Sequence, residues 1–102
     1  MVDIKQLQEK VYQNKVEHGF NVTDVYQEFC YLNCEISEAF EAWHRNGGEG
    51  LGEELADVAI YLLGLCEILG VDLETEILRK MEKNSKRKYM KVDGKWVHTE
   101  GN

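Results

Sequence analysis

The sequence predicts an all-α protein: a bundle-like protomer of four helices, followed by a short C-terminal β-hairpin. Proline is absent from all 102 residues, and apolar residues recur at helical spacing along most of the chain. These periodic stretches are interrupted at a few glycine-bearing places, which is typical of helices joined by short turns. We expect residues 1–102 to form a single helical domain in which residues 91–102 are a tail or hairpin.

The first two helices are expected over about Asp3–Glu17 and Asp24–Arg45. A glycine at position 19 provides a C-terminal stop for the first helix, and the polar residues that follow it provide N-cap candidates for the second. The second helix carries an apolar stripe at helical spacing, which we expect to be core. Its members are Leu32, Ile36, Ala39, Phe40 and Trp43.

The next two helices are expected over about Glu53–Leu69 and Leu73–Lys88. Four glycines within residues 46–52 end the second helix and reverse the chain. The third helix is apolar over most of its circumference, so we expect it to be central or buried on two sides. Gly70 ends it, and the Asp-Gly pair within residues 92–97 predicts the hairpin.

Charge and composition exclude several classes of protein. The formal net charge is −7, from 12 basic and 19 acidic side chains, which argues against binding to a nucleic-acid backbone. No apolar run approaches the roughly 18 residues of a membrane span, and no secretory signal is visible. Three cysteines without a CxxC pair fit a reducing compartment. We therefore expect a cytoplasmic protein with no membrane or nucleic-acid partner.

The small size of the chain predicts self-association. A chain of this length buries only about two-thirds of its unfolded surface, so helical folds of this size often gain burial by pairing with a copy of themselves. We therefore expect a homodimer or a homotetramer.

Two pairs of carboxylates are the main chemical feature of the sequence. Glu35 and Glu38 are three residues apart on the second helix, as are Glu54 and Asp57 on the third. Each pair therefore points from one helix face, and antiparallel packing across the short turn brings the four carboxylates together. A hard divalent cation relieves their repulsion. Oxygen-only ligands favour Mg²⁺, or Mn²⁺, over zinc.

Other interpretations of these carboxylates are open at this point. Glutamates on an acidic helix are often ordinary solvated groups. A di-iron site needs histidine three residues after glutamate on two helices, whereas this chain has Glu38 and Asp57 at those positions. Two observations favour a site. The pairs interrupt core-forming helices, and Tyr61 extends the same face four residues after Asp57. Its ring is then placed to pack against a base or a sugar.

These motifs resemble those of the MazG-like all-α nucleoside triphosphate pyrophosphatases, and most nearly the small dCTP pyrophosphatase-like and dimeric dUTPase-related members. The resemblance covers residues 24–90. It includes an ExxE motif, an ExxD motif after a variable turn, and a Lys-x₃-Asn-x₂-Arg segment. In this chain these are Glu35-Ile36-Ser37-Glu38, Glu54-Leu55-Ala56-Asp57 and Lys80-Met81-Glu82-Lys83-Asn84 followed by Arg87.

The resemblance implies a Mg²⁺-dependent hydrolase that cleaves (deoxy)nucleoside triphosphates to the monophosphate and pyrophosphate, in nucleotide-pool house-cleaning. The implied metal ligands, which are also the implied catalytic groups, are Glu35, Glu38, Glu54 and Asp57. The expected substrate-binding residues are Lys80, Asn84 and Arg87 at the phosphates, and Tyr61 and Trp43 at the base.

Two alternative functions stay open. A phosphoribosyl-nucleotide pyrophosphohydrolase would use the same metal site, whereas a non-catalytic helical oligomerisation or interaction module would keep the carboxylates for structure alone. Simpler interpretations also exist for the substrate residues. A basic helix end complements the helix dipole without touching substrate, and an aromatic residue on a core stripe, such as Trp43, is usually there for packing.

Overall fold

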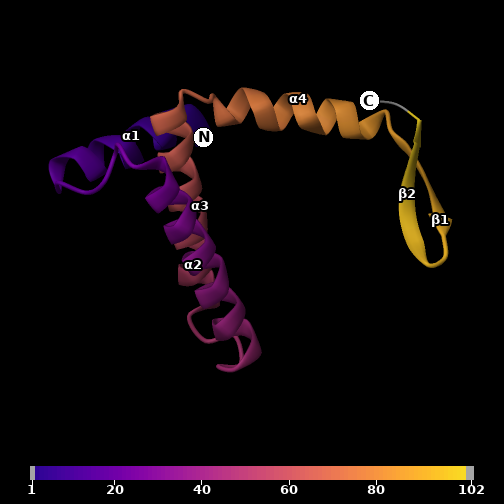
Figure 1. Cartoon of the computed structure of the whole chain (residues 1–102), viewed down its shortest axis with the longest axis horizontal. Helices are drawn as coiled ribbons and strands as arrows, with labels where there is room; N and C mark the ends of the chain where they lie inside the picture. Colours follow the sequence, from indigo (N-terminus) through magenta and orange to yellow (C-terminus); the bar gives the residue numbers. More distant parts are fainter. Residues whose placement is uncertain (1, 101–102) are drawn as a thin grey trace. The chain divides into compact units, whose positions relative to one another are not determined.

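The computed structural model describes residues 2–100, and for residues 89, 90 and 98–100 it describes the backbone alone. Four helices and a terminal hairpin follow one another along the chain, which confirms the predicted all-α class (Figure 1). They form two compact units, one with α1 to α3 and the other with α4 and the hairpin. The elements are α1 (Ile4–Glu17), α2 (Val25–His44), α3 (Leu51–Leu69), α4 (Leu73–Ser85), β1 (Lys88–Val92) and β2 (Lys95–Glu100).

Local side chains and glycines account for the helix ends. The carboxylates of Asp3 and Asp24 each accept a hydrogen bond of 3.1 Å from a backbone N–H in the first turn of α1 and α2. Helix α3 begins two residues earlier than predicted because Gly50, at φ 77°, turns the chain directly into the helix. Helix α4 ends three residues earlier than predicted because the backbone from Lys88 onward pairs in the hairpin.

In the first unit, α2 and α3 pack side by side as a helical hairpin, and α1 packs against α3 (Figure 1). The close approach of α1 to α3 depends on Gly64 in the middle of α3. A Cβ atom there would lie 3.2 Å from Cδ of Lys15 and 3.3 Å from Cγ1 of Val11. The absence of a side chain at Gly64 therefore leaves room for the stem of a lysine.

The predicted core stripe of α2 is wrong for the single chain. Ala39 is buried, but Ile36 is 50%, Phe40 53% and Trp43 61% exposed. Helix α3 is central in the first unit, as expected, because both α1 and α2 pack against it, although Leu55 near its start is 52% exposed. These apolar side chains are exposed because, in the first unit, α1 is the helix that packs against the α2–α3 hairpin. One helix cannot cover both sides of it.

In the second unit, β1 and β2 pair antiparallel around Asp93-Gly94, as the sequence predicts. Both turn residues have positive φ, 51° and 78°, which is the conformation that favours Asp-Gly in two-residue hairpin turns. Trp96 on β2 is 69% exposed, and Nζ of Lys91 lies 5.8 Å from its ring centroid. Among the described residues, no helix is long and apolar enough to cross a membrane.

Candidate metal and substrate site

Three of the four predicted carboxylates come together between α2 and α3. Glu35 and Glu38 on α2 and Glu54 on α3 each offer one carboxylate oxygen, and these oxygens lie within 4.8 Å of one another. Glu35 and Glu54 are half-buried, and Glu38 is exposed. We call these three residues the carboxylate cluster.

The carboxylate cluster lacks the partners that buried carboxylates normally have. One oxygen of Glu35 and one of Glu54 (Oε2 in each) are buried without a hydrogen-bond partner. Burial raises the pKa of both side chains, and the neighbouring carboxylates of Glu38 and Asp57 raise it further. Unpaired oxygens with clustered negative charge are what a divalent cation requires, so these residues fit one.

Asp57 lies one helical turn after Glu54 on α3, at the edge of the carboxylate cluster. It is not among the residues whose oxygens lie within 4.8 Å of one another. Its charge nevertheless contributes to the raised pKa of Glu35 and of Glu54. The structure therefore places the fourth predicted ligand beside the other three.

Tyr61 continues the same face of α3 beyond Asp57. Its ring packs edge-on against the ring of Tyr31, with centroids 5.9 Å apart, and Nζ of Lys15 lies 5.2 Å from its centroid. Burial raises the pKa of the Tyr61 hydroxyl, and the charges of Glu35 and Glu28 add to this effect. Tyr61 also lines two cavities, of about 350 Å³ and about 300 Å³.

Trp43 lies in a different place. Its ring is 6.2 Å from that of Phe40, centroid to centroid, and both line an apolar hollow of about 290 Å³ between α2 and α3. This hollow shares no lining residue with the two cavities beside Tyr61. Within one chain, the structure therefore does not bring the two predicted base-contacting residues to a common pocket.

The predicted phosphate-binding residues belong to the second unit. Lys80 and Asn84 are exposed on α4, one turn apart, and Arg87 follows the helix and is half-buried. The backbone N–H of Arg87 donates to the carbonyl of Asn84 over 3.1 Å. The helical spacing expected for Lys80 and Asn84 is therefore present.

Sequence reasoning missed a buried ion pair that lies close to Tyr61. Nζ of Lys15 on α1 donates to Oε1 of Glu28 on α2 over 2.5 Å, and Asn21 donates to the other oxygen over 3.0 Å. One signal in the sequence pointed to it. Glu28 precedes Glu35 by seven residues and so lies on the same helix face.

The comparisons with known proteins agree with this fold. The model of the MazG-like family matches residues 27–99, and the chain therefore belongs to the MazG-like family. The family assignment supports the predicted enzyme class, a hydrolase that acts on nucleotide phosphoanhydrides, over a non-catalytic helical module. Among curated proteins, none matches the chain.

A solved structure with a similar fold is that of the cyanophage S-2L MazG-like pyrophosphohydrolase. The two chains share 24% sequence identity with a TM-score of 0.75, over 97% of this chain and 94% of that one. The cyanophage protein is bound to dGDP and to three catalytic Mn²⁺ ions per active site. At this level of identity, the likeness establishes the fold.

Proposed function

We propose that this protein is a divalent-metal-dependent nucleotide pyrophosphohydrolase. It would cleave (deoxy)nucleoside triphosphates to the monophosphate and pyrophosphate, as part of nucleotide-pool house-cleaning. The observation that carries the proposal is the carboxylate cluster, in which two buried oxygens lack a partner. The dGDP and Mn²⁺ bound by the structurally similar cyanophage protein support a nucleotide substrate and a divalent cation.

The proposed metal ligands are Glu35, Glu38 and Glu54, with Asp57 as a fourth carboxylate beside them. Mg²⁺ is the expected cation and Mn²⁺ the alternative, since both accept oxygen ligands. When bound, the cation supplies charge neutralisation at the phosphates and makes a water molecule more acidic.

The attacking water loses a proton, and a carboxylate of this chain is the proposed acceptor. Attack of water on the α-phosphorus forms a new P–O bond and breaks the bridging bond to the β-phosphate, which leaves as pyrophosphate. We assign the proton that the water loses to a carboxylate oxygen of the cluster.

Other residues are proposed to bind the two ends of the substrate, the base and the outer phosphates. Tyr61 packs against the base or sugar, and Trp43 is the second proposed aromatic contact. Lys80, Asn84 and Arg87 bind the β and γ phosphates, where the guanidinium of Arg87 matches two phosphoryl oxygens at once.

A second copy of the chain is the proposed partner of the exposed apolar face of α2 and α3. Each helix carries an apolar residue at alternating intervals of four and three residues, the pattern of helices that pack lengthwise against others. Many of these side chains are about half exposed, which is more apolar surface than a monomer usually leaves in water. The stripes are Val25, Phe29, Leu32, Ile36, Ala39 and Trp43, and Leu51, Leu55, Val58, Leu62, Leu65 and Leu69.

Pyrophosphate release from a panel of nucleoside triphosphates tests the activity. We expect Mg²⁺ or Mn²⁺ to support turnover of at least one triphosphate, with equal amounts of monophosphate and pyrophosphate formed. Glu38→Gln is the matched control, because it changes one carboxylate oxygen to an amide nitrogen and keeps the shape of the side chain. If no triphosphate turns over faster than with this variant, the proposed function is wrong.

Sedimentation equilibrium tests the proposed partner. We expect the mass of a dimer or tetramer for the unmodified chain, and a shift towards the monomer for Leu55→Arg, which places a charge in the exposed apolar face. A monomeric mass for the unmodified chain at micromolar concentration would contradict self-association.

A further inference from the structure

The ion pair between Lys15 and Glu28 is the most completely buried charged feature among the described residues. Glu28 is 1% and Lys15 8% exposed. Both oxygens of Glu28 are used, because Oε1 accepts from Lys15 and Oε2 accepts from Asn21. The carboxylate is therefore fully satisfied within the first unit, and the ammonium is held at one position.

Stability alone is a poor reason for this pair. Removing two charges from water is expensive, and replacing such a pair by apolar side chains is often neutral or stabilising. The hydrophobic residues that are buried in the described part of the chain are Ala39, Ala42, Leu65 and Cys66. This apolar core is small, so a larger one would be the simpler way to gain stability. The pair is better explained by what its ammonium group faces.

The fold also makes room for the stem of Lys15. Gly64 lies inside α3, where glycine is less favourable to the helix than alanine. A methyl group at this position would meet Cδ of Lys15 at 3.2 Å. The lysine is thus held by Glu28 at its charged end and lies against the α3 backbone along its stem.

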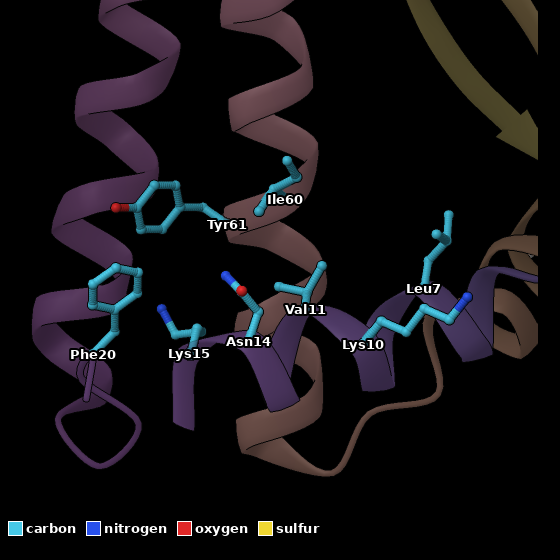
Figure 2. Close-up of a pocket in the computed structure, with 8 residues that line it drawn as sticks. All are labelled: Leu7, Lys10, Val11, Asn14, Lys15, Phe20, Ile60 and Tyr61. Atoms are coloured by element: carbon cyan, nitrogen blue, oxygen red, sulfur yellow. The ribbon is translucent and has the colours of Figure 1, made fainter. Parts of the chain in front are cut away.

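The ammonium group of Lys15, which Glu28 holds in place, faces the two cavities beside Tyr61. Lys15 and Tyr61 line both of them, together with Phe20. Figure 2 shows the Lys15 ammonium directed towards the Tyr61 ring, with the Phe20 ring next to it. Lys15 carries three N–H donors, and within the described residues its hydrogen bond to Glu28 uses one of them.

The surroundings favour a flat, uncharged ring over a phosphate as the occupant. Glu28 already balances the charge of Lys15, so the pair has little net attraction for a polyanion. Aromatic and aliphatic side chains supply most of the remaining wall of the larger cavity, namely Leu7, Val11, Phe20, Ile60 and Tyr61.

The position along the helices also suits a base. Glu28 precedes Glu35 by seven residues on α2, and Tyr61 follows Glu54 by seven residues on α3. Seven residues span about 10 Å of helix, which is comparable to the length of a nucleoside. A nucleotide with its phosphates at the carboxylate cluster can therefore reach Lys15 with its base.

We propose that Lys15, held by Glu28, is a specificity-determining residue that donates a hydrogen bond to a ring carbonyl oxygen of the nucleobase. The site then prefers bases that carry such a carbonyl over adenine, which carries none. This inference rests on the proposed function for the location of the phosphates, and it adds the chemical class of the base.

Binding of two nucleoside monophosphates, dIMP and dAMP, tests this inference without any turnover. Their bases differ at position 6, where hypoxanthine has a carbonyl and adenine an amino group. By isothermal titration calorimetry, we expect the unmodified protein to bind dIMP at least about tenfold more tightly than dAMP, the usual effect of one hydrogen bond to a charged donor. Equal affinities would overturn the inference.

Variants then assign the preference to Lys15. Lys15→Met leaves Glu28 buried without its counter-charge and is expected to unfold easily. The informative variant is therefore the apolar pair Lys15→Met with Glu28→Leu. We expect this folded double variant to bind dIMP and dAMP equally. Lys5→Met, on the same helix as Lys15, breaks an exposed ion pair with Asp72. It is the matched control and should keep the preference. A preference that survives in the double variant would overturn the inference.

The same panel separates the two proposals. If no triphosphate is hydrolysed but dIMP is still preferred through Lys15, the proposed function fails and the binding inference stands. If triphosphates are hydrolysed with the same kcat/KM for dITP and dATP, the inference fails and the proposed function stands.

Discussion

Helix α2 carries two glutamates on one face, seven residues apart, and the fold treats them in opposite ways. Glu28 is almost completely buried, and each of its oxygens accepts a hydrogen bond, from Lys15 and from Asn21. Glu35 is half-buried beside two other glutamates, and its Oε2 is buried without a partner. The charge of Glu28 is balanced by Lys15, whereas Glu35 lies among other negative charges.

This difference separates a permanent part of the fold from a site for a ligand. A buried carboxylate with all its partners present contributes to the native structure at all times. A cluster of carboxylates without counter-charge destabilises the native state until a cation binds, because like charges repel at short distance.

The largest effect is expected on catalysis when the carboxylate cluster is changed. Glu35→Gln should lower pyrophosphate release by at least about a hundredfold, because a ligand and its charge are lost together. The melting temperature of the metal-free variant should be equal to or higher than that of the unmodified protein, since repulsion is relieved. Glu49→Gln, in the exposed turn between α2 and α3, is the control and should change neither quantity.

The second effect is expected on stability when the buried pair is broken. Glu28→Gln leaves the Lys15 ammonium without its counter-charge and should lower the free energy of unfolding by about 3 to 5 kcal/mol. Urea denaturation monitored by circular dichroism measures this loss. If Glu28→Gln were no more destabilising than Glu35→Gln, the contrast between the two glutamates would be wrong.

The third effect is a gain of stability on addition of metal. A ligand that binds only the native state stabilises it, by about 2.7 kcal/mol at a concentration one hundred times its Kd. Mg²⁺ or Mn²⁺ should therefore raise the melting temperature of the unmodified protein. The double variant Glu35→Gln with Glu54→Gln should show no rise, whereas the Lys15→Met, Glu28→Leu protein should keep it. A rise of equal size in the cluster variant would place the metal elsewhere.

The smallest effect is a dependence of stability on pH in the absence of metal. The pKa of Glu35 and of Glu54 is raised in the native state, so the folded protein holds protons that the unfolded chain releases near the ordinary glutamate pKa of about 4.3. Stability should therefore fall as pH rises from there through the native pKa values, and stay at the lower level above them.

Thermal melting between pH 4 and pH 8 measures this fall, and Glu54→Gln provides the comparison. The variant should lose part of the fall, because one of the two titrating groups is gone. A stability profile that rises over the same range, with equal slope in both proteins, would contradict the unbalanced state of the carboxylate cluster.

Much of the fold could be predicted because its signals are local. The positive φ angles at Gly50, Gly70 and the Asp93-Gly94 turn follow from the conformational freedom of those residues, and Asp24 caps α2 through a bond to a neighbour three residues away. Such interactions depend on a few adjacent residues, so the sequence shows them directly.

Part of the candidate site could be predicted for the same reason. Glu35 and Glu38 share a face by helical spacing, and a short turn between α2 and α3 brings Glu54 back to them. Trp43 and Tyr61 line separate hollows because they lie at different levels of the α2–α3 hairpin. Trp43 lies beside Leu51 and Leu55 at the start of α3, whereas Tyr61 lies further along that helix.

The helical class, the end of α3 at Gly70 and the pairing of carboxylates could all be predicted, because each follows from spacing along one chain segment. Which charges are balanced depends on how the helices pack in three dimensions. Lys15 reaches Glu28 from another helix, and its stem fits because Gly64 on a third helix has no side chain. Such a contact requires three helices to pack at once, and neither the periodicity nor the charge of any single helix predicts it.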